Sequence, residues 1–222
     1  MRALLALLVA NFRSTLTREM AMDTLWPEAD PALAVNSLNQ AVFQLRRVVD
    51  PGFRDGESPP YVLSSVDAVQ LNPDLVVTDL DEFRRIASEV RSTPEPARGH
   101  QIASLVDIVR GEFLAELRYE DWAVRSRTPV HAEVRGMLLP IAAGEWHTNP
   151  DLAIRAASSL LELDPYDEAA QLALARQLHA SGRRTAAQAA ILRFVKKLRD
   201  DLDEPPSDEL ASLVTGWGQA RD

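Results

Sequence analysis

The segment 31–49 constrains the fold most strongly, because it has the length, end signals and periodicity of a single helix. Asp30 is a helix N-cap, Pro31 occupies the first helical position, and Asp50 begins a turn sequence that ends the helix. Its apolar residues recur at spacings of four, three and four, which is the period of one helix face: Leu38, Val42, Leu45 and Val49. The sequence therefore predicts a helix over 31–49 with this stripe packed against other elements.

The opposite face of the predicted helix carries amide, aromatic and guanidinium groups. These groups repeat at the same spacing: Asn36, Gln40, Phe43 and Arg47, flanked by Asn39, Gln44 and Arg46. Asparagine and glutamine pair with adenine in the DNA major groove, arginine pairs with guanine, and an apolar group contacts the thymine methyl. The alternative is an ordinary solvent-facing surface, although such a surface is usually richer in glutamate and lysine, which the segment 31–49 lacks.

The neighbouring segments complete a small α/β pattern. Helix signals cover 2–11, and a second helix follows the N-cap residue Thr17 and stops before Pro27. The segments 61–63 and 69–71 have the composition of short strands joined by a turn. Three helices followed by a hairpin is the order of a winged helix-turn-helix, an order that other small α+β domains share.

From residue 79 onward the sequence is predicted to be helical throughout. Similar helical segments begin at Asp151 and Thr185, 34 residues apart, which is the tetratricopeptide period. Helix pairs of this kind bury their apolar faces only by stacking, and the stack forms a groove that binds proteins. Helices that pack only on one another are the alternative. The predicted breaks between helices lie at 93–96, 149–150, 164–165, 181–182 and 205–206.

Composition narrows the classes of function. The chain has 222 residues, 46% of them hydrophobic, and no cysteine, which excludes disulfides and thiol chemistry. The net charge is -9, and residues 1–78 carry six arginines against nine acids, a net charge of -3. A DNA-binding domain normally has a basic surface, so a DNA contact here is expected to be weak, local or dependent on a second copy.

The sequence contains no recognisable catalytic, cofactor-binding or metal-binding motif. Glycine-rich phosphate loops and the Gly-x-Ser-x-Gly motif are absent, and the acidic run 200–204 lacks the spacing of a metal-binding loop. The four histidines lie too far apart for paired zinc ligation: His100, His131, His147 and His179. We therefore expect a protein that is not an enzyme and that has no cofactor or metal.

The cellular location is also predicted from the sequence. No apolar run reaches the ~20 residues of a membrane span. The first ten residues resemble the start of a signal peptide but are too short for one, and a buried first helix explains them better. We expect a cytoplasmic protein.

Short motifs follow one another in a fixed order over nearly the whole chain. The first part contains Leu16-Thr17-Arg18-Glu19, Leu25-Trp26-Pro27 and the run 37–47. The second part contains Asp79-Leu80-Asp81-Glu82-Phe83, Arg110-Gly111-Glu112-Phe113-Leu114, Trp122 and the run 163–168. In this order and spacing the chain resembles the Streptomyces antibiotic regulatory protein (SARP) family. Members of that family join an OmpR-type winged helix to a bacterial transcriptional activator domain (BTAD).

The resemblance implies a mainly α fold, with a winged helix-turn-helix DNA-binding domain over 1–78 and a tetratricopeptide-like BTAD over 79–222. It implies a transcription activator whose 31–49 helix is the recognition helix. Its partners would be promoter double-stranded DNA, RNA polymerase and a second copy, with no membrane. Carried over by position, the DNA-binding residues are the base readers Asn36, Asn39, Gln40, Phe43 and Gln44, and the phosphate contacts Thr17, Arg46 and Arg47.

Two departures from the family pattern leave a second function open. The family's winged helix begins with an antiparallel sheet, whereas this chain starts at the first helix, so we expect the wing to lack partner strands. The mid-helix position that is usually basic is Gln44 here, beside Phe43, which when exposed would mark a protein contact. The alternative is a protein-interaction module, a degenerate regulator that no longer binds DNA by itself.

Overall fold

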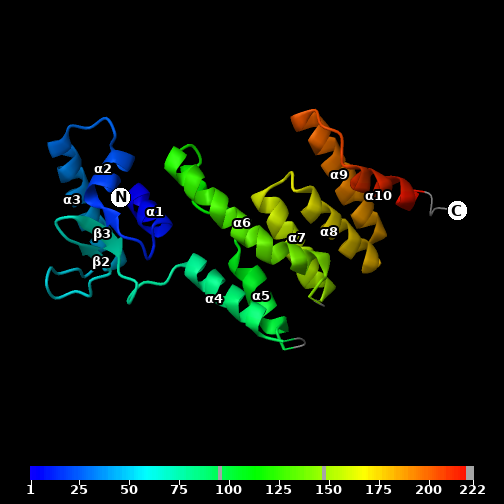
Figure 1. Ribbon diagram of the computed structural model, residues 1–222, viewed down its shortest axis with the longest axis horizontal. Coiled ribbons are helices and arrows are strands. Elements are labelled where there is room, and N and C mark those ends of the chain that lie inside the picture. The colour runs from blue at the N-terminus through cyan, green and yellow to red at the C-terminus, as the bar shows by residue number, and fades with distance from the viewer. Residues whose placement is uncertain (95–96, 147–148, 219–222) are drawn as a thin grey trace. The chain divides into compact units, whose positions relative to one another are not determined.

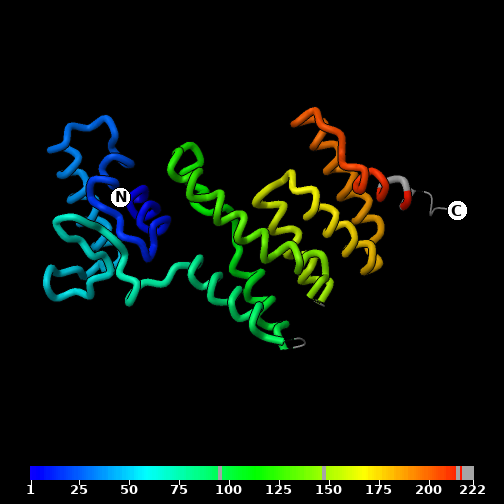
Figure 2. The backbone as a smooth tube through the Cα atoms, viewed as in Figure 1, coloured from blue at the N-terminus to red at the C-terminus, as the bar shows by residue number. Residues whose placement is uncertain are grey.

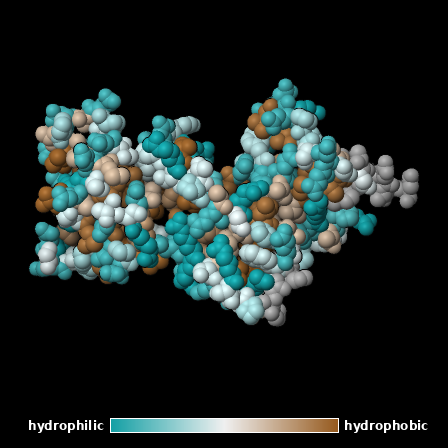
Figure 3. Space-filling model, in the orientation of Figure 1, coloured by the Kyte–Doolittle hydropathy of each residue, from teal (hydrophilic) through white to brown (hydrophobic). Residues whose placement is uncertain are grey.

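The computed structural model describes residues 1–94, 97–146 and 149–218 (Figures 1 and 2). Helices dominate, and the strands form a small antiparallel sheet, so the predicted mainly α class with a β-hairpin is confirmed. The chain forms two compact units: Met1–Asp81 with Leu114–Thr128, and Glu82–Phe113 with Pro129–Asp222. On the face seen in Figure 3, both units have polar surface interrupted by smaller apolar areas.

The first unit contains the predicted helix-turn-helix elements. Its elements in chain order are α1 (Arg2–Ala10), β1 (Leu16–Thr17), α2 (Arg18–Leu25), α3 (Pro31–Val49), β2 (Val62–Ser64) and β3 (Ala68–Leu71). The 3-10 helix η1 (Ala115–Leu117) and the first turns of α6 (Asp121–Ala143) also belong to it. The bounds of α3 are those predicted from the sequence, and α1 and α2 end within one residue of their predicted ends.

Side-chain caps fix where α2 and α3 begin. The Thr17 hydroxyl accepts a hydrogen bond of 3.1 Å from the Met20 backbone N–H, and the Asp30 carboxylate accepts one of 2.9 Å from the Ala32 N–H. Each bond satisfies one of the N–H groups that the first turn of a helix leaves without a partner. The short loop between the two helices is therefore set by local sequence.

The sheet has the order β1-β3-β2, with both pairings antiparallel. Leu16 lies opposite Val69, and Val62 lies opposite Leu71. The expectation that the wing lacks partner strands was therefore wrong, because β1 supplies one. The segment 15–17 has the composition of a break between helices. Its strand conformation comes from pairing with β3 and from burial of Leu16 in the core.

The apolar face of α3 packs into the core of the first unit. Leu38, Val42 and Leu45 are buried there as predicted, whereas Val49, at the end of the stripe, is 39% exposed. Trp122 and Ala123 of α6 belong to the same core. The first unit is thus completed by residues about 50 positions beyond the end of its hairpin.

Asp81 marks the end of the first continuous stretch of this unit. Its carboxylate accepts hydrogen bonds from the Thr78 hydroxyl, from the Thr78 N–H at 3.3 Å and from Arg13 Nε at 2.9 Å. Burial opposes its ionisation, but these bonds together with the Arg13 charge hold the pKa of Asp81 below its ordinary value. The loop after α1 is thereby joined to the start of helix α4 (Asp79–Ser92).

The second unit consists of helices. They are most of α4 (Asp79–Ser92), then α5 (Gly99–Ile108), the remainder of α6, α7 (Pro150–Leu163), α8 (Glu168–Ala180), α9 (Arg184–Leu202) and α10 (Asp208–Gly218). Helix α8 packs against both α7 and α9 (Figure 1), which is the stacking expected from the 34-residue spacing. Four of the predicted breaks lie between helices. The break at 93–96 falls partly on residues outside those described.

Candidate nucleic-acid interface

Helix α3 presents its predicted polar face to solvent within the first unit. Six side chains of this face are exposed: Asn36, Asn39, Gln40, Phe43, Gln44 and Arg47. The Phe43 ring is 52% exposed, and the Arg47 guanidinium, one helical turn further on, lies 5.9 Å from the ring centroid. The helix therefore displays four amides, an aromatic ring and a guanidinium along its length, a set that can contact base edges.

Arg18, at the start of α2, joins three elements of this face. Its Nη2 donates to Asn39 Oδ1 on α3 at 2.5 Å, and its Nη1 donates to the Ser64 hydroxyl of β2 at 3.1 Å. Its backbone N–H donates to the Asp67 carbonyl in the hairpin turn at 2.9 Å. The base-reading set predicted from the sequence did not include Arg18. A cation directly after the N-cap Thr17 was the available signal.

The bond from Arg18 orients the Asn39 amide. It uses one of the two lone pairs of Oδ1, so the second lone pair and the Nδ2 donor remain for a further contact. A bidentate pairing with adenine needs both the oxygen and the nitrogen of the amide. Asn39 therefore keeps the groups that such a pairing requires, in an orientation that Arg18 sets.

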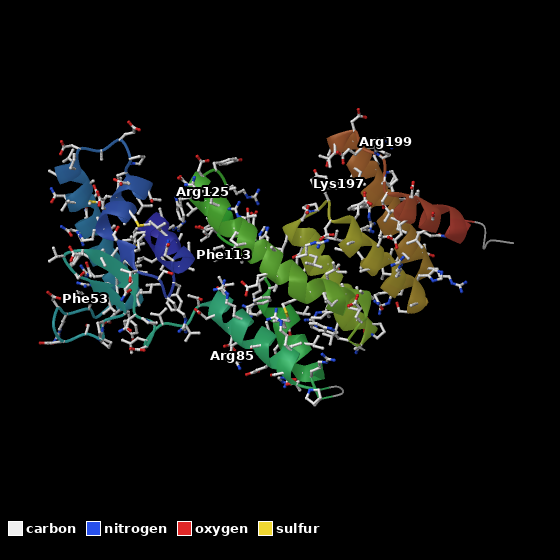
Figure 4. The ribbon with its side chains drawn as sticks, viewed as in Figure 1. Phe53, Arg85, Phe113, Arg125, Lys197 and Arg199 are labelled. Carbon is white, nitrogen blue, oxygen red and sulfur yellow. The ribbon has the colours of Figure 1, made fainter. Side chains whose placement is uncertain are left out.

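Arg46 connects α3 to the hairpin. Its Nε and Nη2 donate to the Val62 carbonyl at 3.3 and 3.1 Å, and its guanidinium lies 5.6 Å from the centroid of the Phe53 ring. Figure 4 labels Phe53 on the loop that precedes β2. Arg46 is accordingly half-buried, and part of its donor capacity is used inside the protein.

Thr17 lies at the exposed amino end of α2. Its oxygen caps the helix, and its hydroxyl proton can still be donated to an acceptor outside the protein. The hairpin tip, by contrast, carries exposed Val66 and Asp67. The tip therefore adds an exposed acid, and no cation, to the hairpin turn.

No group of three or more histidine, aspartate or glutamate side chains is placed to hold a metal ion within 1–94, 97–146 and 149–218. His147 lies outside these ranges, and His179 is in the last turn of α8. No helix in the described part of the chain is long and apolar enough to cross a membrane.

Comparison with known proteins places the second half of the chain in a family. The family model for the bacterial transcriptional activator domain matches residues 78–215. A solved structure of Mycobacterium tuberculosis EmbR, in complex with a low-affinity phosphopeptide, is similar to this chain with a TM-score of 0.64 and 22% sequence identity. That similarity covers 100% of this chain and 59% of the EmbR chain, and it shows a shared fold.

No curated protein matches the chain. The family match agrees with the resemblance to SARP regulators, which carry the same domain. The chain belongs to the bacterial transcriptional activator domain family, a family of transcription regulators.

Proposed function

We propose that this protein is a transcription activator that binds promoter DNA through α3. The observation that carries the proposal is the solvent-facing row of Asn36, Gln40, Phe43 and Arg47 on a helix whose other face is buried. An α-helix fits the major groove of B-DNA, and these side-chain types read base edges there. The proposal divides the chain at about residue 78, with the DNA-binding domain before it and the activator domain after it.

Each predicted site residue has a place in the proposed contact. Asn36, Asn39, Gln40 and Gln44 read base edges with their amides, and Phe43 contacts a thymine methyl. Arg47 binds phosphate, Thr17 adds a hydroxyl contact, and Arg46 binds phosphate with the donors that Val62 does not use. Arg18 joins this set as the residue that fixes Asn39 and the wing.

The net charge of residues 1–78 limits the strength of the proposed binding. Residues 1–78 have a net charge of -3, and Asp67 is exposed at the hairpin tip. We expect two or three phosphate contacts per copy, which corresponds to a slope of log K against log salt of about -2 to -3. Binding strong enough for regulation then requires two copies on neighbouring half-sites. The activator domain would supply that dimer contact and the contact with RNA polymerase in the cytoplasm.

One observation favours a second function, a protein-interaction module. Phe43, Leu33 and Val48 are exposed apolar side chains on α3, and exposed apolar residues gathered on one element are typical of protein contacts. The net charge of -3 on residues 1–78 is also compatible with this function, because a partner protein, unlike DNA, does not require a basic surface.

Fluorescence anisotropy with labelled fragments of the DNA upstream of the protein's own gene separates the two functions. The activator proposal predicts saturable, sequence-preferring binding that weakens as salt is raised. A scrambled fragment of the same length and composition is the control. Equal binding to both fragments, or no binding at low salt, would favour the interaction module.

A further inference from the structure

A groove on the surface of the second unit lies among α7, α8 and α9. Its volume is about 250 Å³. Leu161, Leu174 and Phe194 give it an apolar wall, and polar groups reach it from Gln171, Arg193 and Lys197. All these residues belong to one compact unit, so the groove is formed within it.

Gln171 is the unusual residue of the groove. Its side chain is 3% exposed, and its Nε2 is buried without a hydrogen-bond partner. Buried amide groups in native proteins nearly always have a partner, because removing a polar group from water without a replacement bond is unfavourable. Gln171 itself lines the groove, so a ligand bound there can supply the acceptor that Nε2 lacks once the amide turns toward it.

The charges at the groove define that acceptor. Its charged lining residues are two cations, Arg193 and Lys197, which lie one helical turn apart on α9. Arg193 is exposed, and Lys197, which is labelled in Figure 4, contacts Asp201 at 3.2 Å and lies 4.9 Å from the Tyr166 ring. Because Asp201 offsets the charge of Lys197, the positive charge at the groove is mainly that of Arg193, and it lies beside an amide donor. Carboxylate oxygens suit both groups.

We propose that this groove binds a partner protein through a short acidic segment. One carboxylate accepts a hydrogen bond from Gln171 Nε2 and lies beside Arg193 and Lys197. A neighbouring apolar side chain of the same segment packs against Leu161 and Phe194. The proposed function includes contacts between the activator domain and other proteins, and this proposal specifies the kind of segment that such a partner presents. It does not depend on DNA binding.

The test uses the full chain and two labelled peptides. The acidic probe is fluorescein-labelled Gly-Ser-Leu-Glu-Glu-Leu-Gly-Ser, and its neutral control has glutamine in place of both glutamates. We expect the acidic probe to bind and the neutral one to bind at least about tenfold more weakly, as the loss of one charge-assisted contact implies. Equal binding of the two peptides, or no binding of either at millimolar concentration, would overturn the proposal.

Two variants locate the contact. Arg193→Glu should weaken binding of the acidic probe, whereas Lys196→Glu, with the same charge change on the same helix but outside the groove lining, should not. Equal effects of the two variants would show long-range attraction only and refute a defined site.

Gln171→Met tests the unsatisfied donor directly. It should weaken acidic-probe binding and leave the melting temperature equal or higher, because it removes a buried donor that has no partner. A lower melting temperature with unchanged binding would show that Gln171 has a structural role.

Binding of upstream DNA by the same variants is measured in parallel, so that failure of this proposal is distinguished from failure of the DNA-binding function.

Sedimentation of the same samples tests a second copy as the occupant. The groove would be a self-association site if the protein forms a dimer, binds neither peptide, and loses the dimer in the Arg193→Glu variant. That result would overturn the assignment to a partner protein.

Discussion

Arg18 holds the side-chain oxygen of Asn39 with a hydrogen bond of 2.5 Å and at the same time donates to the Ser64 hydroxyl at 3.1 Å. One guanidinium therefore links the start of α2, the middle of α3 and the end of β2. The Asn39 amide is oriented by the protein itself, and in the proposed DNA contact an oriented group would lose less conformational freedom on binding.

Replacement of Arg18 by methionine should reduce DNA affinity and sequence preference together. The guanidinium no longer orients Asn39 or anchors the wing, and we expect a loss of about 1–2 kcal/mol on the preferred fragment. Arg54→Met is the matched control, because Arg54 is an exposed arginine of the same unit that pairs with Glu57. Anisotropy on preferred and scrambled fragments measures both effects. An equal effect of the two variants on DNA affinity would show that Arg18 has no specific role in the interface.

Gln40 should contribute to sequence-specific DNA affinity, whereas Arg47 should contribute to DNA affinity for any sequence. Gln40→Ala should cost about 1–3 kcal/mol on the preferred fragment and little on scrambled DNA, because a base contact is lost. Arg47→Ala should weaken binding to both fragments alike and reduce the salt slope by about one, because a phosphate contact is lost. Salt titrations of both variants measure these quantities. Equal losses on both fragments for Gln40→Ala would contradict its role as a base reader.

Trp122 should stabilise the first unit although it lies far beyond its hairpin. The residue is 9% exposed and belongs to the core that contains Leu4, Leu8 and Leu38. Trp122→Ala should cost about 3–5 kcal/mol, because it removes a large apolar side chain and leaves a cavity. Tyr119→Ala is the control, since Tyr119 is 97% exposed three residues earlier and its loss should be nearly neutral. Urea unfolding of both variants decides the outcome, and equal stabilities would show that this segment does not support the first unit.

The ion pair between Arg135 and Asp167 should make the second unit sensitive to acid. Arg135 Nε and Nη2 donate to the buried Asp167 carboxylate at 2.6 and 3.2 Å, and the same carboxylate caps α8 through the Ala170 N–H at 3.1 Å. Burial opposes ionisation, but the hydrogen bonds and the Arg135 charge lower the pKa of Asp167 below its ordinary 3.8. A lowered pKa means that the pair stabilises the fold fully above pH 3.8 and that this stabilisation is lost as pH falls below it.

We therefore expect Arg135→Met to lower the free energy of unfolding by about 1–2 kcal/mol at neutral pH. Hydrogen bonds to a charged group often contribute more than this, but water screens this pair because the Arg135 side chain is half exposed. The difference from the parent should shrink as pH falls below 3.8. Urea unfolding at pH 7 and at pH 3 measures it. Arg176→Met, which breaks the exposed pair with Glu209, should cost less at both values. A cost for Arg135→Met that is independent of pH would contradict the electrostatic explanation.

The sequence by itself determined the elements whose signals lie in neighbouring residues. Asp30, Pro31 and Asp50 fix the bounds of α3, because capping and proline geometry act within one turn of the helix. The 34-residue spacing predicted the stacking of α7, α8 and α9, and the strand-like composition of 61–63 and 69–71 predicted the hairpin. The exposed polar face of α3 followed from helix periodicity once the opposite stripe was buried.

Tertiary structure decided the features that join residues distant in the chain. The strand β1 exists because Leu16 pairs with Val69, and Trp122 enters the first core because packing there accepts a large ring. The bond between Arg18 and Asn39 and the unsatisfied Gln171 amide likewise depend on which elements become neighbours. Such contacts have no local signal, because their free energy comes from burial and pairing that only the folded chain creates.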